Sequence, residues 1–138
     1  MARLSTLLDT NILALAFRRA PEVLSATEIA ITKRLSSMLV QGEAGVIGPS
    51  RQEVLTGIRH VSQFDRLRYL LDGIKTIDLE LEDFDEAARL TNVLLTKGIT
   101  VSPNDSLLAA AALRRNLSVY TLDADFQHFS RLGLALAI

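Results

Sequence analysis

Short apolar runs alternate along the chain with longer segments whose apolar residues recur at helical spacing. The apolar runs at 3–8, 44–48, 75–79, 117–122 and 134–138 have the length of buried strands. Helices are predicted between them at 11–19, 25–42, 50–61, 62–73, 81–98, 102–116 and 124–133. Because strands that alternate with helices build parallel sheets, this order predicts a single α/β domain over residues 1–138. We expect a central parallel sheet with helices on both faces.

Local polar signals mark several of the predicted helix ends. Three pairs have the spacing of a capping box or its aspartate variant, and Pro103 falls at a first helical position. These pairs are Ser25 with Glu28, Ser50 with Glu53, and Ser102 with Asp105. The acidic run from Glu80 to Glu86 is interpreted as a solvated helix start, where the helix dipole favours negative charge.

Composition narrows the class of protein. Hydrophobic residues make up 49% of the 138 positions and charged residues 22%, so the chain can bury a substantial core. The net charge of −1 excludes a strongly basic nucleic-acid footprint, and a nucleic-acid partner would need a local patch. The absence of cysteine excludes disulfides and thiolate metal sites. With no membrane-length apolar run and no signal peptide before Asp9, we expect a cytoplasmic protein.

Four acidic residues occupy positions that a parallel sheet would bring to one edge. Asp9 follows the first strand, Glu53 lies early in the helix after the second strand, and Asp123 follows the strand at 117–122. Asp105 lies in the first turn of the alanine-rich helix. Open parallel sheets bind ligands outside the carboxyl ends of their strands. Each acid alone is explained as a helix cap, but Ser, Thr or Asn would cap without adding charge.

Carboxylates gathered at one edge repel each other, by about 4 kcal/mol for a pair ~4 Å apart at an effective dielectric constant near ~20. Such a cluster needs protons or a cation. Oxygen ligands without His or Cys favour Mg²⁺ or Mn²⁺ over zinc. Because magnesium commonly meets its substrate through phosphate oxygens, the hypothesis is metal-assisted hydrolysis of a phosphate ester.

Four stretches resemble the PIN domain and, within it, the VapC-type ribonuclease toxins of toxin–antitoxin pairs. They are LLDTNIL at 7–13, GPSRQEVLTG at 48–57, NDSLLAAAALRRN at 104–116 and VYTLDADF at 119–126. The resemblance covers nearly the whole chain. It implies a Mg²⁺- or Mn²⁺-dependent endoribonuclease that hydrolyses RNA with metal-activated water, as the toxin of a type II toxin–antitoxin system. It also implies a VapB-like antitoxin partner and a homodimer.

The resemblance also implies roles for individual acids. Asp9 and Asp105 match the family's principal metal-binding acids, Glu53 matches the acid after the second strand, and Asp123 matches the last acid. All four are therefore expected to be catalytic and to bind metal. Some relatives place the last acid directly before the phenylalanine, so Asp125 competes with Asp123. We favour Asp123 because it lies nearer the strand end.

Residues around these acids receive further interpretations. Thr10 is a candidate for a hydrogen bond near the metal and Asn11 for holding the strand–helix turn, although both are also ordinary capping residues. His60 and His128 are interpreted as surface or packing residues. Arginines should ring an acidic pocket that binds RNA, since guanidinium groups bind phosphates well. The candidates are Arg51, Arg114 and Arg115, followed by Arg18, Arg19 and Arg59; solvated helix faces are the ordinary alternative.

The protein partners are expected to contact the helical region from 25 to 70 and the residue Phe17 before it. Candidate contacts are Phe17, Met38, Phe64 and Tyr69, with core packing as the alternative for each.

Other functions stay open at this point. A metal-dependent phosphatase of the haloacid dehalogenase class needs a D-x-D near its start, where this chain has Asp9-Thr10-Asn11. A response-regulator receiver needs a lysine after a late strand, and none of Lys33, Lys75 and Lys97 follows one. A non-catalytic α/β interaction module would use the same acids only as caps. Cation binding by the isolated protein would separate this module from the nuclease.

Overall fold

The computed structural model describes residues 3–137 and contains a five-stranded sheet in which all strands are parallel. The strand order is β3-β2-β1-β4-β5. The strands are β1 (Thr6–Leu8), β2 (Ala44–Ile47), β3 (Lys75–Ile77), β4 (Ser118–Tyr120) and β5 (Ala135–Leu136). The predicted α/β class with a parallel sheet is confirmed. The last predicted strand extended to residue 138, which lies outside the described residues.

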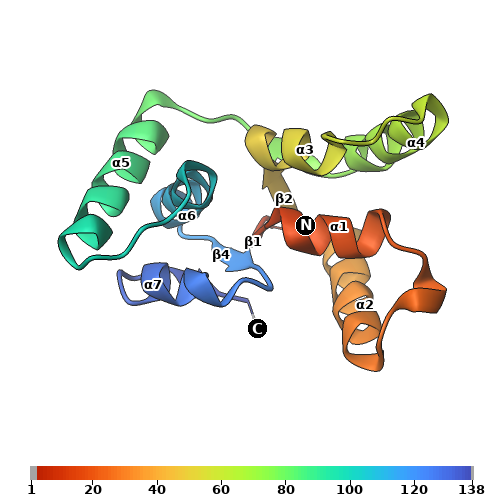
Figure 1. Cartoon of the computed structure of the whole chain (residues 1–138), viewed down its shortest axis with the longest axis horizontal. Coiled ribbons are helices and arrows are strands. Elements are labelled where there is room, and N and C mark those ends of the chain that lie inside the picture. The colour runs from red at the N-terminus through yellow and green to blue at the C-terminus, as the bar shows by residue number, and fades with distance from the viewer. Residues whose placement is uncertain (1–2, 138) are drawn as a thin grey trace.

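Helices cover both faces of this sheet, as predicted. In Figure 1, α5, α6 and α7 lie on one side of the sheet, and α1 to α4 lie on the other. The helices are α1 (Thr10–Phe17), α2 (Ala26–Val40), α3 (Gly48–Leu55), α4 (Val61–Asp72), α5 (Leu81–Thr96), α6 (Pro103–Arg115) and α7 (Gln127–Ser130), with 3-10 turns at Pro21–Val23 and Ala124–Phe126. Within residues 3–137, no helix is long and apolar enough to cross a membrane.

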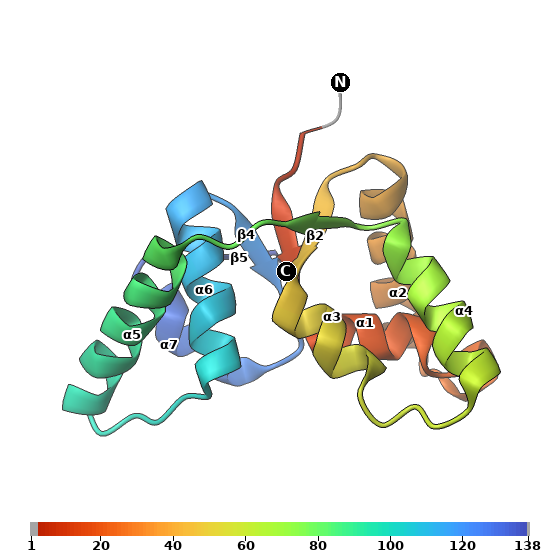
Figure 2. The ribbon, with the colours of Figure 1, turned by 90° about the horizontal axis from the view of Figure 1, so that it is seen from above.

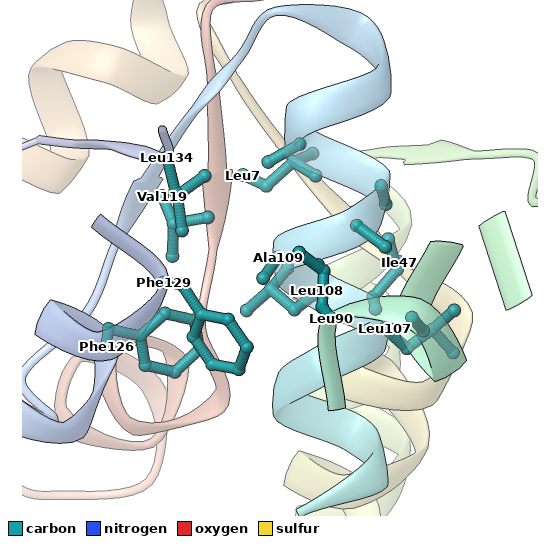
Figure 3. Close-up of a cluster of buried hydrophobic side chains, with 14 of the residues drawn as sticks. Leu7, Ile47, Leu90, Leu107, Leu108, Ala109, Val119, Phe126, Phe129 and Leu134 are labelled. Carbon is teal, nitrogen blue, oxygen red and sulfur yellow. The ribbon is translucent and has the colours of Figure 1, made fainter. Parts of the chain in front are cut away.

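The central strands are mainly apolar because their side chains alternate between two cores. Leu7 and Val119 point into the core formed with α5, α6 and α7, where Phe126 and Phe129 also pack (Figure 3). The next side chain along β1, Leu8, points into the core on the side of α1 to α4. A parallel strand that is covered on both faces requires such a continuous apolar run.

The alanine-rich helix α6 lies directly on the sheet. Its residues from Ala109 to Ala112 are fully buried, and α5 packs on its outer side. Ser102 caps α6 by accepting a hydrogen bond from the backbone N–H of Asp105 at 3.1 Å. Since α6 leads back to the start of β4, it runs antiparallel to the strands. Its N-terminal end therefore lies at the edge where the strands have their carboxyl ends, as Figure 2 shows.

The structure corrects one predicted helix start. Ser50 and Glu53 form no capping box, because α3 already begins at Gly48. Ser50 is buried inside that helix, with 5% of its surface exposed. Proline at the first positions of α3 begins the helix without a side-chain cap.

The acidic run at the start of α5 is not wholly solvated, contrary to its interpretation. Asp83 is fully buried and accepts a hydrogen bond from the backbone N–H of Glu80 at 2.7 Å. It also binds the guanidinium groups of Arg114 and Arg115, at 2.7 and 2.6 Å. Hydrogen bonds from Arg115, from the backbone of Glu80 and from Arg114 hold the pKa of Asp83 well below its usual range, against the raising effect of burial. This cluster joins the start of α5 to the end of α6.

Candidate active site

Asp9 lies where β1 ends and α1 begins, and only 8% of its surface is exposed. Its Oδ1 accepts a hydrogen bond from the backbone N–H of Thr10 at 2.7 Å, so Asp9 also caps α1. Its Oδ2 accepts hydrogen bonds from the hydroxyl of Thr121 at 2.7 Å and from the amide of Asn11 at 3.3 Å. Burial raises the pKa of Asp9, and the charges of Glu53 and Asp123 add to this effect, against the lowering effect of the hydrogen bonds from Thr121 and Thr10.

Asp105 reaches the same edge from the first turn of α6, because that helix runs antiparallel to the strands. It is half-buried. Burial raises its pKa to about 6, and the negative charges of Asp9, Asp123 and Glu53 also raise it, while Ser102 opposes the shift. Each of the other three acids thus acts electrostatically on Asp105.

Glu53 and Asp123 are more exposed than Asp9. Glu53 accepts a hydrogen bond from the hydroxyl of Thr10 at 3.0 Å, which ties α3 to the start of α1. Asp123 follows β4 and caps the 3-10 turn by accepting a hydrogen bond from the backbone N–H of Asp125 at 2.9 Å. The charge of Asp123 is among the main causes that raise the pKa values of Asp9 and Asp105, and the charge of Asp125 is not. Asp125 is exposed. Asp123 therefore stays the predicted last acid, with Asp125 as its competitor.

Thr121 and Asn11 connect the loop after β1 with the loop after β4. The hydroxyl of Thr121 donates to Asp9 and accepts from the backbone N–H of Asp123 at 3.0 Å and from the amide of Asn11 at 3.2 Å. The side-chain oxygen of Asn11 accepts from the backbone N–H of Leu122 at 3.1 Å. The hydroxyl of Thr121 thus donates one hydrogen bond and accepts two, which is its full capacity. Asn11 holds the turn as predicted.

Thr121 was not singled out by the sequence reasoning, although a signal for it exists. A hydroxyl residue two positions before an aspartate commonly forms a local turn by accepting a hydrogen bond from the backbone. The stretch Thr121-Leu122-Asp123 has this spacing directly after a buried strand. The hydrogen bond to Asp9, which is distant in sequence, was not deducible from that spacing.

The site offers only oxygen donors, which suit a hard divalent cation such as Mg²⁺ or Mn²⁺. Among residues 3–137, no three Asp, Glu, His or Cys side chains are grouped closely enough to hold a metal ion as they stand. The charges that raise the pKa values of Asp9 and Asp105 are all carboxylates, so this edge of the sheet carries surplus negative charge that favours a cation.

The predicted arginine contacts are engaged elsewhere. Arg114 and Arg115 lie at the C-terminal end of α6, which is the opposite edge of the sheet, and bind Asp83. Their predicted place beside the acidic pocket is therefore wrong. Asp105 lies in the first turn of α6 and the two arginines lie in its last turn, so the length of the helix separates them. Arg51 lies on α3 but forms an ion pair with Asp72 at 2.7 Å.

The predicted partner contacts also separate into core and surface residues. Met38 is buried in the core, so it is not available as a contact. Tyr69 is 77% exposed on α4. Phe17 and Arg18 line a cavity of about 260 Å³ with Arg66 of α4. Of the two histidines, His60 is exposed and His128 is half-exposed, in agreement with their interpretation as surface or packing residues.

Comparison with known proteins places this arrangement in a family. Residues 6–132 match the PIN domain model. No curated protein matches the sequence. Similar solved structures include VapBC2 from Rickettsia felis bound to a promoter DNA fragment, with a TM-score of 0.77, 20% identity, and 97% of this chain and 98% of that chain covered. DNA-bound VapBC from Salmonella typhimurium has a TM-score of 0.76, 19% identity and 98% coverage of both chains.

A third solved structure, FitAcB from Neisseria gonorrhoeae, has a TM-score of 0.70 and 19% identity, with 96% of both chains covered. At these identities the three structures show a common fold. The family model covers nearly the whole chain, and it matches the segments that carry Asp9, Glu53, Asp105 and Asp123. The chain belongs to the PIN domain family.

Proposed function

We propose that this PIN domain is a Mg²⁺- or Mn²⁺-dependent endoribonuclease that hydrolyses phosphodiester bonds in RNA. The observation that carries the proposal is the electrostatic coupling of Asp9, Glu53, Asp105 and Asp123, which come from four separate segments. The charges of Glu53 and Asp123 raise the pKa values of Asp9 and Asp105, which is costly for the ionised acids unless a cation binds there. Family membership supports the same conclusion, since PIN nucleases generally depend on divalent metals.

Each acid receives a role from its surroundings. Asp9 and Asp105 would hold the metal ion, and Glu53 and Asp123 would complete the charge set and orient the attacking water. When bound, a divalent ion stabilises charge on the phosphoryl group and makes water a stronger nucleophile. Hydrogen bonds from Thr10, Asn11 and Thr121 already hold the carboxylate of Asp9 in place. This supports its assignment as the principal ligand, because a fixed carboxylate needs no reorganisation on binding.

Asp105 should make metal binding depend on pH. With a pKa of about 6, its carboxyl is ionised at pH 7.5 and largely protonated at pH 5. Protons and the metal ion then compete for the same oxygens, so metal binding should release a proton and weaken in mild acid.

We further propose that the protein is the toxin of a toxin–antitoxin pair, with a VapB-like antitoxin and a homodimeric state. The similar VapBC structures support the antitoxin partner. The exposed side chains of α4 belong to the region proposed to contact partners. Val61 is 75% exposed and Tyr69 is 77% exposed, so both are available to a protein partner.

A non-catalytic interaction module is the second candidate function. The observation in its favour is that no three metal-ligating side chains within residues 3–137 are grouped tightly. Such a module would bind neither Mg²⁺ nor Mn²⁺ at this edge, whereas the nuclease must bind one of them.

The decisive experiment uses the purified full-length protein without its partner on a pool of cellular RNA. The native protein should cleave in Mg²⁺ and stop in chelator. Asp9→Asn should reduce cleavage by more than ~100-fold, since loss of a ligand exceeds the 10–100-fold effect of an outer-shell change. Glu82→Gln, which changes an exposed acid of α5 outside the predicted site, is the matched control and should keep its activity. Cleavage that survives both Asp9→Asn and the chelator would overturn the proposal.

A further inference from the structure

A small polar cavity lies beside Glu53, one of the four acids of the candidate site. It has a volume of about 350 Å³ and is lined by Pro49, Gln52, Glu53, Thr56 and Asn104. This volume falls in the range of ~300–1,000 Å³ in which proteins bind small molecules and cofactors. We call it the amide cavity, because the side-chain amides of Gln52 and Asn104 form part of its lining.

Each of the two amides directly precedes a predicted site acid in the sequence. Gln52 stands before Glu53 on α3, and Asn104 stands before Asp105 in the first turn of α6. Helix α3 directly follows β2, so it begins at the edge of the sheet where the strands have their carboxyl ends. The amide cavity therefore lies between α3 and the start of α6 at this edge, where it can receive the part of a substrate next to the reacting bond.

The backbone under both amides is held in place. The hydroxyl of Thr56 donates to the backbone carbonyl oxygen of Gln52 at 2.7 Å. Ser102 caps the turn that carries Asn104 by accepting from the backbone N–H of Asp105 at 3.1 Å. The side chains of Gln52 and Asn104 are themselves exposed, so their polar ends can turn toward a ligand. Recognition groups are positioned more precisely on helices such as these than on loops.

The charge of the lining selects which part of a nucleotide fits. Among the described residues, no arginine or lysine lines the amide cavity, and the charged side chain in its lining is that of Glu53. A phosphate would be repelled by this carboxylate and would find no cation. An amide instead carries a hydrogen-bond donor and an acceptor side by side, as the edge of a nucleobase does. The cavity therefore suits the base of an unpaired nucleotide, which is the part of RNA that proteins read for sequence.

Adenine matches these amides best among the four bases. It presents its N6 amino group beside the acceptor N7, and an asparagine or glutamine amide binds this pair through two hydrogen bonds. Guanine presents two acceptors at the same edge, which favours arginine or lysine. The amino group of cytosine favours a carboxylate, and the carboxylate of Glu53 is already proposed to complete the charge set around the metal ion.

We infer that Gln52 and Asn104 recognise an adenine next to the phosphodiester bond that is cleaved. The adenine lies in the amide cavity while the phosphate lies at the four acids. This assignment rests on the RNA hydrolysis proposed above and adds a base preference to it. The two amides determine specificity and are not metal ligands, so their loss should remove the preference and leave metal binding intact.

Mapping of the RNA ends tests this preference. The native protein is incubated in Mg²⁺ with a pool of cellular RNA, and the new ends are sequenced. Adenine should be enriched at one of the two positions that flank the break. Gln52→Ala combined with Asn104→Ala should lose this enrichment. Gln41→Ala should keep it, because this control removes an exposed amide at the end of α2, at the opposite edge of the sheet.

A single chemical group on the substrate gives a sharper test. Short RNAs that contain the mapped site are made with adenosine or with purine riboside, which lacks the N6 amino group, at the enriched position. For the native protein, purine riboside should lower kcat/KM by at least ~10-fold. For the double variant, both RNAs should react at the same rate. The double variant should also keep the native circular dichroism spectrum and the native affinity for Mn²⁺ in calorimetric titration, since both positions are exposed.

The outcomes separate the adenine preference from the nuclease on which it rests. Cleavage without adenine enrichment, or enrichment that survives the double substitution, would overturn the preference and leave the nuclease standing. If the native protein cleaves no RNA, binding of labelled short adenylate, uridylate and cytidylate homopolymers decides. Tighter binding of adenylate that the double substitution removes would support the amide cavity and count against the nuclease alone. Equal binding of all three would overturn both.

Discussion

The raised pKa of Asp105 predicts that the acidic site destabilises the protein when no cation is bound. Its pKa is about 6 in the folded protein, against an ordinary value of 3.8. A carboxyl with a raised folded-state pKa binds protons more tightly in the folded protein, so stability falls as pH rises from about 4 through about 6. A shift of ~2 units corresponds to roughly 3 kcal/mol, which screening by water at this half-exposed group reduces to about 1–2 kcal/mol.

The substitution Asp105→Asn removes this charge and keeps the size of the side chain. We expect it to raise the free energy of unfolding by about 1–2 kcal/mol at pH 7.5 in chelator. The gain should disappear near pH 4, where the native carboxyl is protonated in the folded protein. Urea unfolding followed by circular dichroism at the two pH values measures the difference. Glu82→Gln, an exposed acid on α5, is the control and should change the free energy by less than ~0.5 kcal/mol.

Two outcomes would refute this reasoning. If Asp105→Asn leaves the stability at pH 7.5 unchanged or lowers it, the charge of Asp105 carries no penalty in the folded protein. If Mn²⁺ stabilises Asp105→Asn as much as the native protein, Asp105 is not a ligand, because only binding to the folded state raises the free energy of unfolding.

Asp83→Asn should lower the free energy of unfolding by about 2–3 kcal/mol in the same urea assay. This is less than the usual cost of breaking a buried ion pair, because the facing guanidinium groups of Arg114 and Arg115 remain hydrated. The lowered pKa of Asp83 gives the opposite pH dependence to Asp105, so its contribution is present at neutral pH and is lost in acid. An effect no larger than that of Glu82→Gln would contradict the first expectation. Thr121→Val should weaken Mn²⁺ binding by at least ~10-fold in calorimetric titration, and Thr121→Ser should restore it. Thr6→Val, which removes another buried hydroxyl at the far end of β1, should leave the affinity unchanged.

The order of helices and strands was predictable because it depends on local patterns. Apolar runs become strands and helical spacing becomes helices wherever their lengths permit. Caps such as Asp9, Ser25 and Ser102 were also predictable, since each uses a backbone N–H within a few residues. The start of α3 was not, because Ser50 has the spacing of a cap and the helix nevertheless begins earlier at Gly48.

Asp83 shows most clearly where local reasoning ends. In the sequence it is one of several acids at a helix start, and only its helical spacing from Ala87, Leu90 and Leu94 distinguishes it from Glu82. Its burial depends on α6 crossing α5 so that Arg114 and Arg115 meet it. Those two arginines are only nine and ten positions from Asp105 in the sequence, yet they lie at the opposite edge of the sheet because a helix joins them.

The sequence by itself determined the α/β class and the parallel sheet, and it predicted four acids at one edge, because strand ends and helix starts of one polarity share an edge. Only the tertiary structure decided that Thr121 holds Asp9, that Asp123 acts on the other acids more than Asp125 does, and that Arg114 and Arg115 serve the interior. These outcomes depend on contacts between segments far apart in the chain. Spacing along the sequence carries no information on such distances or on the burial that shifts a pKa.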